Sequence, residues 1–337
     1  MLPTYSDHDP ILLITEPTCL RHHRKTKIQC FEEKWVAHAN CEERIRTSWA
    51  QSQPIGSLMF CLFEKTKACR MDLVAWSRNT FGNTRDWLNS KQVEMEELMA
   101  VGFGENLDRI YEVQREINDL LHHEEVFWLQ RSRSIWLPTG DKNTKYFHQR
   151  ASQWHKKNTI EGMHDTNGVW CTNIREIANI VEAYYKGLFT TLTNLNMESV
   201  LASVDNVVIE EMARSLKHSY TEEVQVALFQ MHPSKSPGPD DMSPFFFQKF
   251  WHIVGHDVTV VVLSLLHSGR YLQKMNYTHI VLIPKKKDPQ YITEYCPISL
   301  GNIVSRIISK VLANRMKPIL PNIKVLLCLV GLSQTTL

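Results

Sequence analysis

The sequence feature that most constrains the fold is the block Lys235-Ser-Pro-Gly-Pro-Asp240. Its two prolines hold φ at about −65°, whereas Gly238 between them can adopt conformations that are closed to other residues. The block therefore predicts a stiff loop with Lys235 on one side and Asp240 on the other. The apolar stretch from Phe245 to Leu266 that follows is predicted to form one long helix behind this loop.

A second constraint lies downstream, where an apolar, β-branched run ends in a proline and three lysines. His279-Ile-Val-Leu-Ile283 predicts a buried strand that ends at Pro284, with Lys285 to Lys287 projecting beyond it. A strand that delivers lysines to a rim suits a phosphate, although such lysines are more often a solvated edge device. From Asn302 to Lys317, apolar residues at helical spacing alternate with basic ones, which predicts an amphipathic helix with a basic side.

The region before residue 130 predicts a helical array. Four helical stretches lie between Phe31 and Trp128, and the first three are separated by breaks at Pro54-Ile-Gly56 and Phe81-Gly-Asn83. Such helices cannot bury an apolar stripe alone, so they are expected to pair as an antiparallel array.

Between residues 131 and 157 the charge changes sharply. Seven lysines and arginines stand there against the single acid Asp141, although the whole chain has a formal net charge of only +2. Cations alternate with aromatic residues, a mixture that suits phosphate contact and base stacking, while a solvated helix face is the competing interpretation. The predicted nucleic-acid-binding residues are Arg131, Arg133, Lys142, Lys145, Arg150, Trp154, Lys156 and Lys157.

A β-hairpin and a helix are predicted after the basic segment. Thr159–Met163 and Gly168–Cys171 flank a turn at Asn167-Gly168, a pair typical of tight hairpins. The helix is predicted from Ile174 to Phe189, and residues 191–208 lack a clear period and are expected to form a loop.

Composition narrows the class of protein. Eight cysteines are scattered without a Cys-x-x-Cys pair or a Cys/His ligand spacing, so the sequence indicates neither a zinc knuckle nor a disulfide framework. No apolar run approaches the length that spans a bilayer, and the first residues lack the basic-then-apolar pattern of a signal peptide. We therefore expect a protein of the nucleus or cytoplasm with no membrane partner.

The order of these blocks carries more information than each block alone. The loop block is followed by Phe-Phe-Gln-Lys-Phe-Trp at 246–251, Leu-Ile-Pro-Lys at 282–285, Pro-Ile-Ser-Leu at 297–300 and Ile-Ile-Ser-Lys-Val-Leu-Ala-Asn-Arg at 307–315. This order resembles the opening of the reverse transcriptase domain of non-LTR retrotransposons, the LINE-like elements abundant in plant genomes. The resemblance implies a partial reverse transcriptase domain, with the fingers and the start of the palm, over residues 191–325. It also implies nucleotide or template contact for Lys235, Asp240, Lys285, Lys286 and Lys287.

Two upstream stretches extend the resemblance. Tyr5-Ser-Asp-His-Asp-Pro-Ile11 is similar to the end of the endonuclease in these elements, where an aspartate orients the histidine that acts as general base. The resemblance assigns this pair to Asp7 and His8, within a remnant of the last endonuclease strand over residues 1–17. Gly140–His148 is similar to the segment just ahead of the polymerase. The implied division then gives a helical linker over 18–130 and a basic segment with hairpin and helix over 131–190.

The catalytic aspartates are expected to be missing. The intact family enzyme holds Mg²⁺ between aspartates that lie downstream of Pro-Ile-Ser-Leu, so the resemblance implies no complete catalytic site, metal site or cofactor in this chain. Residues 326–337 match the family's next segment translated one nucleotide late, which predicts a frameshifted tail. Two further departures are Asp241, where the family has glycine, and Cys296, where it has an arginine that contacts nucleotide or template backbone.

The sequence thus predicts an α+β, mostly helical fold, with an antiparallel helical linker followed by a partial reverse transcriptase. The expected function is that of a truncated LINE-like reverse transcriptase, inactive as a polymerase but binding RNA or DNA weakly and with little sequence preference. One alternative is a retained helical module between Phe31 and Trp128 that docks a protein partner, and another is a complete polymerase with unusual metal ligands. Salt-dependent RNA binding favours the first, and salt-insensitive self-association favours the helical module. The sequence does not indicate an oligomeric state.

Overall fold

The computed structural model of the chain describes residues 30–101, 103–132, 144–190, 209–218, 220, 223–269 and 276–320. This part of the chain is mostly helical with two small antiparallel sheets, which confirms the predicted α+β class. Its elements are η1 (Glu33–Ala37), α1 (Asn40–Gln51), α2 (Leu58–Phe81), α3 (Thr84–Val101), α4 (Phe103–Ser132), α5 (Thr144–Lys157), β1 (Met163–His164), β2 (Trp170–Cys171), α6 (Ile174–Phe189), α8 (Glu210–Lys217), α9 (Glu223–Phe229), α10 (Pro244–Lys249), α11 (Trp251–Ser268), β3 (His279–Pro284), η2 (Ile292–Glu294), β4 (Tyr295–Leu300) and α13 (Ile303–Met316).

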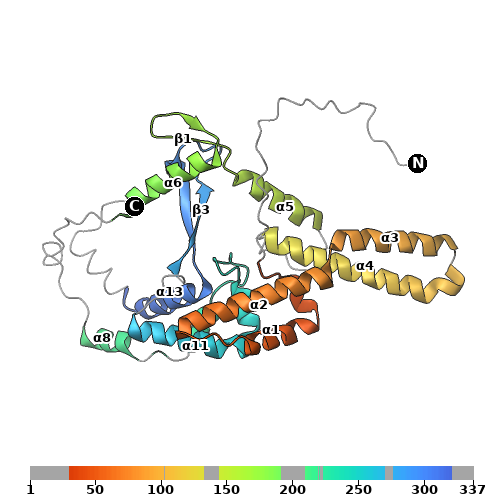
Figure 1. Cartoon of the computed structure of the whole chain (residues 1–337), viewed down its shortest axis with the longest axis horizontal. Helices are drawn as coiled ribbons and strands as arrows, with labels where there is room; N and C mark the ends of the chain where they lie inside the picture. The colour runs from red at the N-terminus through yellow and green to blue at the C-terminus, as the bar shows by residue number, and fades with distance from the viewer. Residues whose placement is uncertain are drawn as a thin grey trace.

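One hydrophobic core joins helices from both halves of the sequence (Figure 1). Its fully buried side chains include Ile45 of α1, Leu73 of α2, Phe246 of α10, Val258 of α11 and Ile307 of α13. The packing therefore crosses the boundary between the predicted linker (18–130) and the predicted polymerase segment (191–325). The division of the chain into domains stays a prediction, but α1 and α2 bury their apolar faces against the polymerase-like helices.

The helix predicted from Phe245 to Leu266 is in fact two helices, so this prediction is wrong in one respect. α10 ends at Lys249 and α11 begins at Trp251, with Phe250 between them at φ −107° and ψ 25°. The Phe250 ring is buried 5.6 Å from that of Phe246 and 6.3 Å from that of Phe31, measured between centroids. Burial of this aromatic cluster outweighs the few backbone hydrogen bonds that a continuous helix would add.

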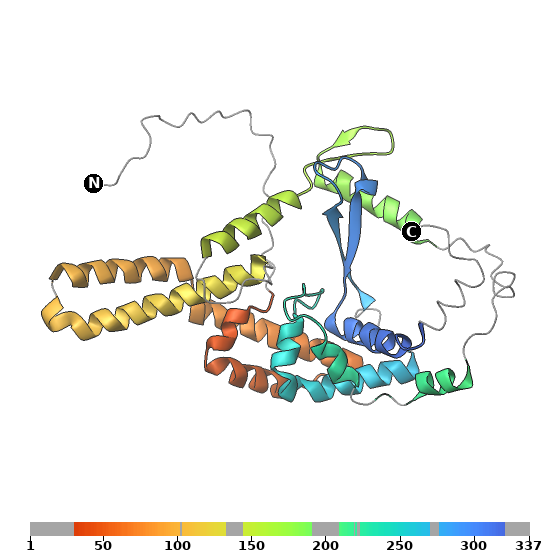
Figure 2. The same cartoon turned by 180° about the vertical axis from the view of Figure 1, so that it is seen from behind.

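α3 and α4 form a helical hairpin that projects away from this core (Figure 2). Their facing surfaces bury a small cluster of Leu88, Met95, Ile110, Val113 and Ile117. These residues recur at three- and four-residue spacings, so each helix presents one narrow apolar stripe to the other. The predicted antiparallel pairing of the linker helices is confirmed here.

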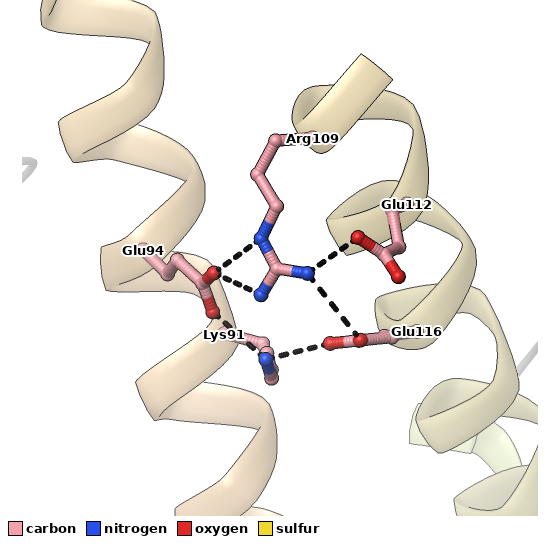
Figure 3. Close-up of polar contacts among 5 residues, drawn as sticks. All are labelled: Lys91, Glu94, Arg109, Glu112 and Glu116. Carbon is pink, nitrogen blue, oxygen red and sulfur yellow. Dashed lines mark hydrogen bonds and ion pairs between the residues drawn. The ribbon is translucent and has the colours of Figure 1, made fainter. Parts of the chain in front are cut away.

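An ion-pair network links the same two helices (Figure 3). The Lys91 ammonium lies 2.8 Å from Glu94 and 2.6 Å from Glu116, and Arg109 donates from Nε to Glu94 at 3.0 Å. Arg109 also lies 2.6 Å from Glu112, one turn further along α4. Because the guanidinium contacts one carboxylate on α3 and another on α4, it favours a single register of the hairpin.

The sheet that carries the three lysines is a two-stranded ribbon. β3 pairs antiparallel with β4, with His279 opposite Leu300 at one end and Pro284 opposite Tyr295 at the other. The first end lies near α13 and the second near α6 and β1 (Figures 1 and 2). The prediction of a buried strand is wrong for its first half, since Ile280 is 49% exposed. Only the far end is covered, by the buried cluster of Met163, Ile177 and Tyr295.

The predicted β-hairpin and the helix after it are confirmed. β1 and β2 pair through Met163 opposite Cys171, and Gly168 adopts φ +79° in the turn that joins them. The Asp165 carboxylate accepts the N–H groups of Asn167 and Val169, both at 2.8 Å, which closes the turn. The following helix, α6, has the predicted bounds.

The Pro-Gly-Pro loop packs against the start of α13. A Cβ atom added to Gly238 would lie 2.4 Å from the carbonyl oxygen of Gly301, so only glycine fits this approach. We predict that Gly238→Ala lowers the free energy of unfolding by about 1–3 kcal/mol, because the clash is with backbone that cannot rotate away. Urea unfolding of the purified chain measures this change.

Gly187→Ala in α6 is the matched control for that measurement. An added Cβ there has no neighbour within 4 Å among the described residues, so the substitution should stabilise the helix by about 0.5–1 kcal/mol. Equal stability of Gly238→Ala and the wild type would contradict the packing of the loop.

Candidate nucleic-acid interface

α5 positions the first group of predicted binding residues. Phe147 is 1% exposed and holds the helix in place, while the neighbouring His148 ring lies 4.3 Å from the ring of Trp128 on α4. Five of the predicted residues are exposed along this helix: Lys145, Arg150, Trp154, Lys156 and Lys157. The guanidinium carbon of Arg150 lies 5.9 Å from the Trp154 ring, so a cation and an aromatic face are presented together.

The β1–β2 hairpin brings an exposed aromatic ring to the end of α5. Trp170 is 45% exposed, and a Cβ atom on Gly162 would lie 2.3 Å from its ring. Glycine at 162 thus lets the indole lie flat against the backbone. The hairpin is fixed to the ribbon end by a hydrogen bond from the His164 N–H to the Gln290 carbonyl at 2.8 Å and by stacking of the His164 and Tyr291 rings at 5.0 Å.

These elements enclose a cleft of about 750 Å³, here called the lysine cleft. Its lining includes Lys156 and Lys157 from the end of α5, Trp170 from β2, and Lys285, Lys286 and Lys287 from the loop after β3. Five lysines face two acids of the same lining, Glu161 and Asp288. The structure therefore brings together two groups of lysines that the sequence analysis had singled out separately.

The three lysines after β3 have different partners. Lys286 lies 2.6 Å from Glu294, and Lys285 donates to the carbonyl oxygen of Thr293 at 2.9 Å. The hydrogen bond from Lys286, with two backbone N–H donors, holds the pKa of the Glu294 carboxyl below its usual range. Lys287 has no ion-pair partner among the described residues, which leaves its charge available to a ligand.

The other predicted contacts do not join this cleft. Arg131 lies 3.0 Å from Glu32, and its guanidinium carbon is 3.4 Å from the centre of the Phe127 ring, so it ties η1 to α4. Lys235 is exposed beside α13 in a separate cleft, near the opposite end of the ribbon. Asp7, His8, Arg133 and Lys142 lie outside the described residues.

Asp240 supports the fold rather than facing the lysine cleft. Its carboxylate accepts the N–H groups of Met242 at 3.4 Å and of Ile303 at 3.5 Å, and its own N–H donates to Asn302 at 3.2 Å. The carboxylate therefore receives one of the free N–H groups at the start of α13. Burial raises the pKa of the Asp240 carboxyl to about 6.

The basic side predicted for α13 is partly structural. Arg315 donates to both oxygens of Glu223 at 2.9 and 3.1 Å, and its side chain is only 7% exposed. Arg306 donates to the carbonyl oxygen of Ser236 at 2.7 Å, and burial lowers its pKa. These two arginines hold α13 to its neighbours, whereas Lys310 lines the cleft that also contains Lys235.

Sequence reasoning missed Trp170 as part of the site. Gly162 faces this tryptophan across the hairpin, but a lone aromatic in a short strand is usually a packing residue, so the sequence carried no clear signal. Within the described ranges, no three His, Cys, Asp or Glu side chains are grouped so as to hold a metal ion. None of the helices in the same ranges is both long and apolar enough to cross a membrane.

Comparison with known proteins places the chain beside a transposon protein. No model of a known protein family matches the sequence. Over 196 residues, or 57% of the chain, it is 26% identical to the transposon TX1 uncharacterized 149 kDa protein of Xenopus laevis. The match covers 15% of that protein's length. This similarity supports a retrotransposon-derived protein, in keeping with the non-LTR elements that the sequence motifs resemble.

The raised pKa of Asp240 makes a testable contribution to pH dependence. Because the folded state binds its proton more tightly than the unfolded state, whose aspartate has a pKa near 3.8, this contribution to stability falls as pH rises from about 4 to about 6. Relative to the wild type, Asp240→Asn should therefore gain stability over this range, by at most about 3 kcal/mol. Urea unfolding at several pH values measures the difference, and a difference that does not change with pH would contradict a buried carboxylate.

Proposed function

We propose that the chain is a fragment of the reverse transcriptase of a LINE-like retrotransposon and that it binds RNA or DNA through its phosphates. The observation that carries this proposal is the lysine cleft, where Lys156 and Lys157 meet Lys285 to Lys287. The two groups lie more than a hundred residues apart in the sequence, so only the fold brings them together. The plant type of the element rests on the sequence motifs.

The chemistry of the cleft favours phosphate contact with little base preference. A cluster of lysines attracts a polyanion at long range and releases its counterions on binding, which makes affinity fall with salt. Trp154 on α5 and Trp170 in the cleft offer exposed aromatic faces on which any base can stack. A single strand suits this arrangement because its bases are free to turn towards the rings.

The proposed fragment does not synthesise DNA. In the family the metal-bound aspartates come from segments downstream of Pro-Ile-Ser-Leu, and Cys296 replaces the arginine that contacts nucleotide or template backbone. Primer extension on an RNA template with Mg²⁺ or Mn²⁺ tests this part of the proposal. Extension above a control without protein would show that the chain carries other metal ligands.

Binding is tested most sharply by removing charge from the cleft. The double variant Lys156→Gln and Lys157→Gln should bind a short single-stranded RNA more weakly than the wild type. Its slope of log affinity against log salt should be smaller in magnitude by about 1 to 1.5, since each lost phosphate contact removes about 0.7. Fluorescence anisotropy over a salt titration measures both quantities.

Lys249→Gln provides the matched control. Lys249 is an exposed lysine on α10 and does not line the lysine cleft, so its removal should leave the slope unchanged. If the double variant and this control lost affinity equally, binding would be a property of overall charge and the cleft would have no special role.

A second candidate function is supported by the α3–α4 hairpin. The hairpin exposes Trp87, Val93 and Tyr111, which are large apolar side chains on a surface that projects from the core (Figure 1). Such side chains are used to dock protein partners. Association that persists at high salt, measured by sedimentation, would favour this helical module over nucleic-acid binding.

A further inference from the structure

A second cleft lies where η1, α2, α4 and α5 meet, and nothing in the proposed function uses it. It has a volume of about 670 Å³, within the range of small-ligand sites. Three aromatic side chains line it, namely Phe81, Phe127 and Trp128, and the rings of Phe127 and Trp128 are nearly perpendicular at 5.2 Å between centroids. We call it the aromatic cleft.

Cations surround these rings. The Lys34 ammonium lies 5.1 Å from the Phe127 ring and 5.4 Å from the Phe81 ring, and Arg131 covers the Phe127 ring from another direction. Arg78 and Arg85 also line the cleft, are exposed, and have no ion-pair partner among the described residues. The cleft therefore combines flat apolar walls with unpaired positive charge at its rim, although the surrounding helices are acidic.

The lining also contains an unused hydrogen-bond donor. Trp35 is 3% exposed, and its indole nitrogen has no hydrogen-bond partner in the described part of the chain. A buried polar group without a partner costs free energy, so a ligand atom that accepts from it would be favoured. His123 lines the same cleft, and burial lowers its pKa, which leaves a neutral ring able to donate or accept near neutral pH.

The aromatic cleft and the lysine cleft share one helix. His148 of α5 lines the first, whereas Lys156 and Lys157 of α5 line the second. Eight residues of helix separate His148 from Lys156, or roughly 12 Å at the usual rise per residue. Lys145 and Arg150 are exposed on the same helix, so positive charge extends from one cleft towards the other.

We propose that the aromatic cleft holds one unpaired base of the strand whose phosphates occupy the lysine cleft. The inference rests on the proposed nucleic-acid binding and adds to it a site for a base. The aromatic walls supply stacking, Trp35 supplies a donor to a ring or carbonyl acceptor of the base, and Arg78 and Arg85 lie where the flanking phosphates would pass.

The test compares variants on two probes of equal length: a short single-stranded oligouridylate, and the ribose-phosphate chain without bases. Phe127→Leu should weaken binding of the oligouridylate by about tenfold and leave binding of the abasic probe unchanged, because only stacking is lost. Trp128→Leu is the second variant and should behave alike, with circular dichroism showing that both are folded. Phe229→Leu removes an exposed ring on α9 outside the cleft and should change neither affinity.

The outcomes separate this inference from the proposed function. If the two aromatic variants bind both probes as the wild type does, or lose equal affinity for both, no base occupies the cleft and this inference is overturned. The double variant Lys156→Gln and Lys157→Gln should still weaken both probes in that case. If the wild type binds neither probe, the proposed function and this inference both fail.

Discussion

The contact between the Pro-Gly-Pro loop and the start of α13 is the interaction on which the rest of the structure depends. Gly238 packs on the backbone of Gly301, and Asp240 accepts the first free N–H group of α13. The next residue, Asp241, forms an ion pair with Arg70 of α2. One short loop thus joins the linker-side helices to the helix that follows the ribbon, and thereby positions the ribbon and the lysine cleft.

The same structure separates two uses of positive charge. Arg131, Arg306 and Arg315 make short hydrogen bonds or ion pairs with several groups at once, as the planar guanidinium allows, and so hold elements together. The lysines of the two groups around the lysine cleft are mostly exposed at the ends of elements. A basic residue near a predicted binding segment is therefore not by itself a binding residue, and the number and geometry of its protein partners decide its role.

Most of the helices, the hairpin turn and the strand before the lysines could be predicted, because each depends on local spacing and on turn residues. Asp241 was also informative: the family has glycine there, and the structure places it at φ 56°, where an ion pair with Arg70 accompanies a conformation that favours glycine. The break at Phe250, the exposure of Ile280 and the meeting of Lys156 with Lys285 depend on packing between distant segments. Local patterns do not contain that information.

The central claim is that nucleic acid binds between α5 and the loop after β3. Ultraviolet crosslinking of a short RNA containing 4-thiouridine to the full chain, followed by identification of the crosslinked peptides, tests it most directly. The account predicts crosslinks in residues 144–157 and 285–290 and at Trp170, all lost at high salt. Crosslinks confined to the cleft beside Lys235 and α13, or spread evenly over the basic surface, would contradict it.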